Sequence, residues 1–171
     1  MGSKIGGDYK NLDKLTEALE LRKQQNYVKS NEMLIELAET YPEDAKIVYQ
    51  CAWSFDVRGM ERRAIPYYQK AIELGLPNQD AQAAFLGLGS TYRTVGEYAN
   101  SKETLEKARK LFPDNRALHV FYALTLFNSN EHHQAMEILI NQLVDTTNDE
   151  EIKRYRKALS FYADKLDTVW E

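Results

Sequence analysis

Small and large apolar residues follow one another in an order that recurs along this chain. The clearest copy runs from Gln82 to Asn115 and contains the pair Leu88-Gly89, then Tyr92, Leu105 and Ala108. A turn-forming Gly96 separates its two halves, so the stretch predicts a hairpin of two helices. Recurrence of such a hairpin at a period near 34 residues is typical of an α-solenoid.

The order holds in the neighbouring stretches when the pattern is moved along the chain. Downstream, Tyr122-Ala123 replaces Leu88-Gly89 with no gap in the spacing. Upstream, the copy that begins at Ala45 needs three extra residues near 75–80, where we expect Gly75 to end one helix and Asp80 to cap the next. The first copy, from Asn11, is weaker, and a degenerate end repeat is typical of a solvent-facing cap.

Small residues at matching positions explain how the two helices of a hairpin pack. They allow close approach of the helices, and larger residues fill the space around them. We expect Gly89 to serve this packing, and Gly87 to leave a notch on the exposed side of its helix. The small positions are Ala18, Ala52, Gly89 and Ala123 in the first helices and Ser30, Ala64, Ser101 and Ala135 in the second.

The pattern resembles the tetratricopeptide repeat family over roughly residues 11–149. The matches are Leu88-Gly89-x-x-Tyr92, Ala108 and Pro113, with Ala64, Tyr68 and Ala71 in the preceding repeat. The early aromatic position holds Val48, Phe85 and His119 instead of tryptophan, and Gln142 stands where alanine is usual. The resemblance implies an all-α, right-handed α-solenoid of about four hairpins, near residues 11–44, 45–81, 82–115 and 116–147.

Residues 148–171 are expected to form one further helix. Capping side chains and carboxylates at 147–151 favour a helix start. Apolar residues spaced three and four apart then predict a single buried face: Ile152, Tyr155, Leu159, Tyr162, Leu166 and Val169. In proteins similar to tetratricopeptide arrays such a helix covers the last hairpin, and the heptad spacing also permits a homodimer seam.

Composition bounds the partners and the compartment. A net charge of −4 with interspersed signs lacks the basic face that nucleic acid needs, so we expect no nucleic-acid partner. Residues 1–10 have no apolar core, so they are predicted to be neither a signal peptide nor a membrane anchor. We expect them to form a flexible leader, of the kind that a cloning step can leave behind. The single Cys51 cannot form an internal disulfide, so the predicted localisation is cytoplasmic.

The sequence contains no recognisable set of catalytic or metal-binding residues. His132 and His133 are adjacent and point in different directions at a helix start, and His119 is expected to be a core residue. Cys51 is expected to be a buried, inert thiol. Gly87 and Gly89 lack the strand and the Lys-Ser/Thr of a phosphate loop. We therefore predict no enzyme activity, no cofactor and no metal.

The remaining functional candidates lie on the first helix of each hairpin, which lines a concave groove in arrays of this kind. The first repeat offers Leu12, Leu15, Leu19, Arg22 and Lys23. The positions selected as partner-binding are aromatic, apolar or hydrogen-bonding: Tyr49, Gln50, Trp53, Asp56, Val57, Leu86, Ser90, Arg93, Val120, Phe121, Leu124, Phe127 and Asn128.

These residues predict a protein-interaction module, an adaptor or scaffold. Its groove would take an apolar peptide or an amphipathic helix of a partner protein. The cationic and amide residues with which chaperone-binding members of the family hold a C-terminal carboxylate are not at the corresponding positions, so we expect no chaperone tail as ligand. The alternative is a self-associating structural protein that dimerises through its last helix.

Overall fold

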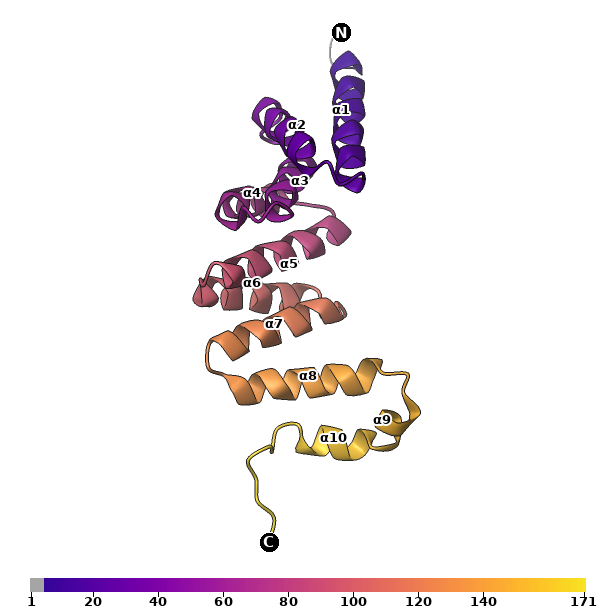
Figure 1. The fold of residues 1–171 in the computed structure, drawn as a ribbon, viewed down its shortest axis with the longest axis vertical. Helices are drawn as coiled ribbons and strands as arrows, with labels where there is room; N and C mark the ends of the chain where they lie inside the picture. The colour runs from indigo at the N-terminus through magenta and orange to yellow at the C-terminus, as the bar shows by residue number, and fades with distance from the viewer. Residues whose placement is uncertain (1–4) are drawn as a thin grey trace. The chain divides into compact units, whose positions relative to one another are not determined.

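The computed structural model describes residues 5–171, and their side chains from residue 12 onward. Every regular element in this range is an α-helix (Figure 1). The helices are α1 (Ile5–Lys23), α2 (Tyr27–Thr40), α3 (Ala45–Asp56), α4 (Glu61–Leu74), α5 (Asn78–Thr94), α6 (Tyr98–Leu111), α7 (Arg116–Asn128), α8 (His132–Thr146), α9 (Glu150–Arg154) and α10 (Arg156–Tyr162).

The start of α1 corrects the expected leader. Residues 5–10 belong to this helix instead of a flexible segment, because the helix continues upstream of the first recognisable repeat position. Residues 1–4 of the expected leader lie outside the described part of the chain. Further along the chain, α3 begins at Ala45 and α7 at Arg116.

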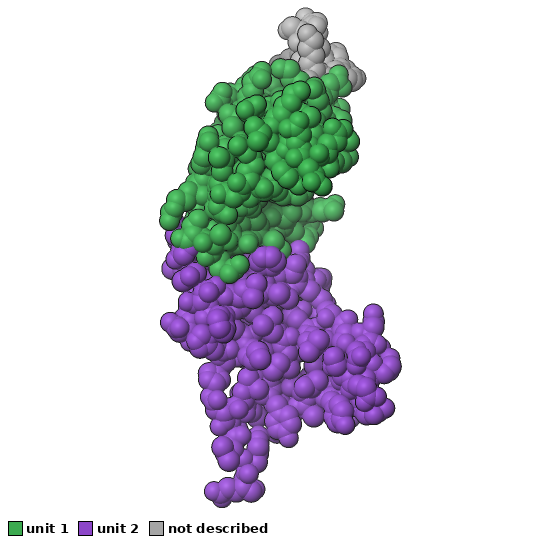
Figure 2. All heavy atoms as spheres, in the orientation of Figure 1, with its two compact units in different colours: residues 1–95 green, residues 96–171 purple. Residues whose placement is uncertain are grey.

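The chain divides into two compact units, residues 1–95 (unit 1) and residues 96–171 (unit 2) (Figure 2). In unit 1, α1 packs on α2, α2 on α3, α3 on α4 and α4 on α5, and α3 also contacts α5. In unit 2, α6 packs on α7, α7 on α8 and α8 on α10. Consecutive helices therefore pack on one another in each unit, as the all-α repeat architecture requires.

Local chemistry fixes the helix starts and ends. The Asp44 carboxylate caps α3 by accepting hydrogen bonds from the N–H groups of Lys46 and Ile47, each at 3.0 Å. Gly75, at φ +86°, ends α4 as expected. The expected cap Asp80 is different: α5 begins at Asn78, so Asp80 lies inside the first turn, where its charge favours the helix N-terminus.

The small residues of the repeat lie where helices meet. In unit 1, Ala18, Ser30 and Ala64 are fully buried, and the Ser30 hydroxyl donates to the Ala18 carbonyl at 2.7 Å. In unit 2, the hydroxyls of Ser101 and Thr125 lie 2.8 Å apart between α6 and α7. Short hydrogen bonds of this kind require the close backbone approach that small side chains permit.

Gly87 is a close-packing position, and the expected exposed notch is wrong. A Cβ placed on Gly87 of α5 would lie 2.6 Å from the ring carbon Cζ of Tyr68 and 2.7 Å from its hydroxyl oxygen. Tyr68 belongs to α4, and only 2% of its surface is exposed. The absence of a side chain at Gly87 therefore lets the ring of Tyr68 lie against α5.

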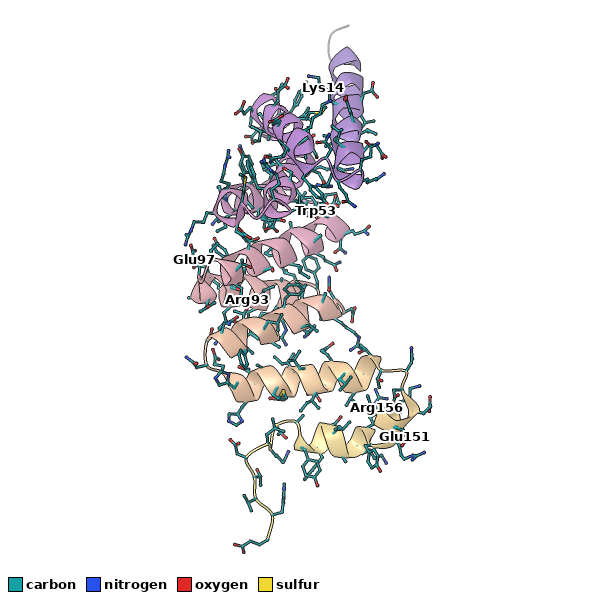
Figure 3. All side chains as sticks on the ribbon, in the orientation of Figure 1. Lys14, Trp53, Arg93, Glu97, Glu151 and Arg156 are labelled. Carbon is teal, nitrogen blue, oxygen red and sulfur yellow. The ribbon has the colours of Figure 1, made fainter. Side chains whose placement is uncertain are left out.

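The expected single C-terminal helix is also wrong. The chain turns at Tyr155 between α9 and α10, and the helix ends at Tyr162. Ile152 and Leu159 are half-buried, while the other members of the predicted stripe are exposed. The break allows α10 to pack on α8, with Arg156 paired to Asp145 at 3.0 Å (Figure 3). Periodicity alone indicates a face and carries no information on where the backbone turns.

Candidate interaction surface

Trp53 is the largest apolar side chain that α3 exposes. It projects from the helix with 40% of its surface exposed (Figure 3). Val57 follows one turn later and is 39% exposed, while Val48, Ala52 and Phe55 are buried on the opposite side. Trp53 and Val57 therefore form an exposed apolar edge on a helix whose other apolar residues are in the core.

The environment of Trp53 is aromatic and contains one arginine. The ring of Tyr49 stacks on Trp53 with 6.4 Å between centroids, and Tyr49 also packs against Tyr68 at 6.2 Å. The guanidinium carbon of Arg22 lies 3.8 Å from the centre of the Trp53 ring, and Arg22 Nη2 donates to Gln50 Oε1 at 2.5 Å. We call Arg22, Tyr49, Gln50 and Trp53 the aromatic shelf.

Two predicted groove residues are not open to a ligand. Tyr49 and Gln50 are buried, which corrects the expectation that they line an accessible surface. Tyr49 is covered by Trp53 and Tyr68, and Gln50 by the end of α1, from which Arg22 reaches across. Counting positions along one helix does not reveal that side chains from two other helices cover it.

Asp56 has a structural role in unit 1. Its carboxylate accepts hydrogen bonds from the Tyr68 hydroxyl at 3.0 Å and from the Thr91 hydroxyl at 2.9 Å. Burial raises the pKa of Asp56, and the two hydrogen bonds oppose that shift in pKa. Asp56 thus joins α3, α4 and α5 and has fewer free lone pairs for setting the register of a peptide.

The other predicted residues of unit 1 lie on α5, which contacts α3. Leu86, Ser90 and Arg93 are all half-buried, so part of each side chain is accessible. They occupy one turn after another of α5. Unit 1 therefore carries a partly exposed strip over two neighbouring helices, with Trp53 as its most exposed aromatic group.

The remaining predicted residues lie on α7 in unit 2. Val120, Phe121 and Asn128 are half-buried, whereas Leu124 is exposed and Phe127 is 60% exposed. The ring of Phe127 packs against the ring of His132 with 4.7 Å between centroids. The predicted groove residues thus fall into two groups, one in each unit.

His119 is half-exposed, so the expectation of a core histidine is wrong. Its Nδ1 accepts a hydrogen bond from Arg109 Nε at 3.0 Å, and its Nε2 lies 2.9 Å from the Pro113 carbonyl oxygen. Because Nδ1 accepts, Nε2 carries the proton and donates to that carbonyl. A polar cleft adjoins it, lined by Pro113, Asp114, Arg116, His119, Gln142 and Asp145.

The other two histidines do not converge. His132 packs on Phe127, and His133 Nε2 lies 2.8 Å from a carboxylate oxygen of Asp167. Over the part of the chain whose side chains are described, no three His, Cys, Asp or Glu side chains are grouped as metal ligands. Nor is any described helix long and apolar enough to cross a bilayer.

Cys51 is buried in α3, and burial raises the pKa of its thiol to about 12. We expect folded protein at about pH 8 to react with Ellman's reagent far more slowly than protein unfolded in guanidinium chloride, because the thiolate is the reactive form. The measurement is the rate of thionitrobenzoate release. Equal rates in the two states would contradict the burial of this thiol.

Comparison with known proteins gives the same fold. The helical-repeat architecture matches solved structures at low sequence identity. One is a fragment of MamA from Desulfovibrio magneticus RS-1, which matches with 15% identity and TM-score 0.71 over 91% of this chain and 86% of its own. A subunit of the APC/C hetero-tetramer Cut9-Hcn1 matches over 87% of this chain and 29% of its own, with 18% identity and TM-score 0.71.

YrrB, described as a TPR protein with an unusual peptide-binding site, matches with 15% identity and TM-score 0.62 over 90% of this chain and 86% of its own. The comparison with curated proteins finds no match. The family model of the tetratrico peptide repeat matches residues 45–166, which is more than half of the chain. The chain therefore belongs to the tetratricopeptide repeat family, whose repeats serve as protein-binding scaffolds.

Proposed function

We propose that this protein is an adaptor that binds an apolar peptide or an amphipathic helix of a partner protein, with Trp53 as the main anchor in unit 1. The single observation that carries the proposal is the exposure of Trp53 on α3, a helix that buries its other aromatic residues. Tryptophan is strongly enriched among residues that dominate binding energy at protein interfaces. Leu86, Ser90 and Arg93 lie on α5, a helix that contacts α3, and supply further contacts in the proposal.

Unit 2 offers a second set of anchors in the proposal. Phe121, Leu124 and Phe127 recur at intervals of three along α7, and Leu124 and Phe127 are exposed. An amphipathic helix presents apolar groups at the same interval, so it fits such a surface. The peptide-binding site in the description of YrrB is consistent with a similar use of this fold.

Selection of phage-displayed random peptides on the purified protein tests the proposal. We expect Trp53→Ala to weaken the selected peptides by at least about tenfold in fluorescence anisotropy, because an aromatic anchor is worth more than about 1.4 kcal/mol. Leu124→Ala and Phe127→Ala test the α7 set in the same assay. The helical circular dichroism should be unchanged in all three variants.

Val28→Ala is the matched control in unit 1. Val28 is an exposed apolar residue on α2, a second helix of a hairpin, so its loss should leave peptide affinity unchanged. Met136→Ala on α8 serves unit 2 in the same way. Absence of any enriched peptide, or equal losses in the Trp53 and Val28 variants, would reject the proposed surface.

Self-association is a second candidate, favoured by the apolar end of unit 2. Phe161 packs against Tyr162 and Trp170, yet all three rings remain about half exposed. Val169 is 89% exposed, so apolar surface remains accessible beside these rings. Sedimentation of the intact chain against Val169→Glu and Trp170→Glu variants tests this candidate. A monomer at every concentration of the intact chain would reject it.

A further inference from the structure

Arg22 is a half-buried cation, and none of the carboxylates among the described side chains pairs with it. It lies in the last turn of α1, and its neighbours on the aromatic shelf are the amide of Gln50 and the rings of Trp53 and Tyr49. Among the residues whose side chains are described, Arg22 takes part in no ion pair, and its Nη1 is buried without a hydrogen-bond partner. Buried charges in proteins are normally paired, so this guanidinium has unused binding capacity.

The neighbouring cation shows the contrast. Lys23, one residue later, is exposed and pairs with Glu20 at 3.2 Å. Asp80 acts electrostatically on Tyr49, but it forms no ion pair with Arg22. Burial lowers the pKa of Arg22, with no carboxylate among the opposing influences on that pKa. Among the described side chains, no anion therefore accompanies the half-buried guanidinium of Arg22.

The shelf also holds Arg22 in a fixed position. The guanidinium carbon lies over an indole ring, 3.8 Å from its centre, and the Gln50 amide oxygen accepts one of the guanidinium N–H groups at 2.5 Å. A planar guanidinium that is already stacked and oriented loses little freedom when it binds a carboxylate with two parallel hydrogen bonds. The Gln50 oxygen is a neutral acceptor, which a charged carboxylate oxygen can displace.

We propose that Arg22 binds the carboxylate of an aspartate or glutamate side chain in the partner peptide, beside an apolar residue that rests on Trp53. This inference rests on the proposed function, since it names the chemistry of the peptide that docks on unit 1. The acidic group displaces the Gln50 amide oxygen at Nη2 and also accepts a hydrogen bond from Nη1, while the guanidinium stays over the Trp53 ring. The apolar neighbour contacts Trp53 and Val57, the exposed edge of α3.

Charge complementarity selects an acidic peptide as the occupant. A neutral peptide would bury Arg22 more deeply without pairing it, which costs free energy. A basic peptide would add repulsion at short range. The partner motif is therefore an acidic residue adjacent to a large apolar residue, with the carboxylate supplied by the acidic side chain.

Two peptide libraries test the inference on the full chain. The first displays random peptides with both ends joined to carrier sequence, so only side-chain carboxylates are present, and the second has free C-termini. We expect wild-type protein to enrich Asp or Glu at one position of the first library, next to an apolar residue. If acidic peptides were enriched only from the second library, through their free C-terminal carboxylates, the proposal that Arg22 binds a side-chain carboxylate would be overturned.

Affinity of one selected peptide and its Glu→Gln or Asp→Asn analogue gives the size of the effect. Against wild-type protein the amide analogue should bind roughly 10- to 100-fold more weakly, as expected for a charge-assisted hydrogen bond. Against Arg22→Gln the two peptides should bind equally, and Lys23→Gln should behave as wild type. Arg22→Lys, which keeps the charge and loses the planar fork, should retain only part of the difference.

The outcomes separate this inference from the proposed function. Loss of all peptide enrichment would reject both. Enrichment of apolar residues that depends on Trp53, with no preference between acid and amide, would retain the proposed function and overturn the role of Arg22. The acid-to-amide comparison on wild-type protein needs no variant to fold, and circular dichroism confirms the helical content of the Arg22 variants.

Discussion

Tyr68→Ala will lower the free energy of unfolding by about 3–5 kcal/mol, the range measured for truncation of a buried aromatic ring. Tyr68 of α4 is almost completely buried and packs against Tyr49. Its hydroxyl donates a hydrogen bond to the Asp56 carboxylate at 3.0 Å. Its loss creates a cavity and removes one of the two hydrogen bonds to the Asp56 carboxylate. Urea denaturation followed by circular dichroism measures the change, with the exposed Tyr27→Ala as the matched control.

The partner of this ring is Gly87, and a double-mutant cycle isolates their contact. Gly87→Ala alone should destabilise unit 1 by up to about 2 kcal/mol, because overpacking costs about 1–3 kcal/mol and the higher helix propensity of alanine offsets about 1 kcal/mol of that cost. In the Tyr68→Ala background the space is open, so the same change should stabilise by up to about 1 kcal/mol. A destabilisation of equal size in both backgrounds would contradict the close approach of Tyr68 to Gly87.

This pair shows what the repeat pattern predicts and what it leaves open. Alanine at positions such as 18, 52 and 64 predicted helix contacts, and these residues are buried. Gly87 lies off that pattern, so its sequence position indicated an exposed site. Its true neighbour comes from α4 of the preceding hairpin, and contacts between successive hairpins depend on the angle at which they stack.

Part of the candidate surface could likewise be predicted from the helical pattern. Trp53, Val57, Leu124 and Phe127 were expected to be accessible, and all four are exposed. Tyr49 and Gln50 share the same helix as Trp53, but α1 and α4 cover them through Arg22 and Tyr68. Helical periodicity assigns a residue to a face, whereas accessibility depends on long side chains that reach across from neighbouring helices.

The prediction of a single C-terminal helix is wrong for a different physical reason. Its apolar residues recur at helical spacing through Val169, yet the helix breaks at Tyr155 and ends at Tyr162. Short helices owe most of their stability to packing, not to periodicity. The packing that exists lies along α8, where Arg156 meets Asp145, so the backbone turns to reach it.

Asp56→Ala will destabilise the protein by about 2–6 kcal/mol, because two buried hydroxyls lose their acceptor and each unsatisfied group costs about 1–3 kcal/mol. The hydroxyls are those of Tyr68 and Thr91, both 2% exposed. Asp56→Asn keeps an acceptor oxygen and should cost less than about half as much. The exposed Asp13→Ala provides the control, with an expected change within about 0.5 kcal/mol.

The raised pKa of Asp56 adds a pH dependence with a definite sign. Burial holds the folded-state pKa above the ordinary value of 3.8, so the folded state keeps its proton at pH values where the unfolded chain has released it. Wild-type stability relative to Asp56→Asn is therefore greatest below pH 3.8 and falls as the pH rises towards the folded-state pKa. Above that pKa the difference is constant. Urea denaturation of both proteins across this range measures it, and a difference that increases with pH would show that the hydrogen bonds from Tyr68 and Thr91 outweigh the cost of burying the charge.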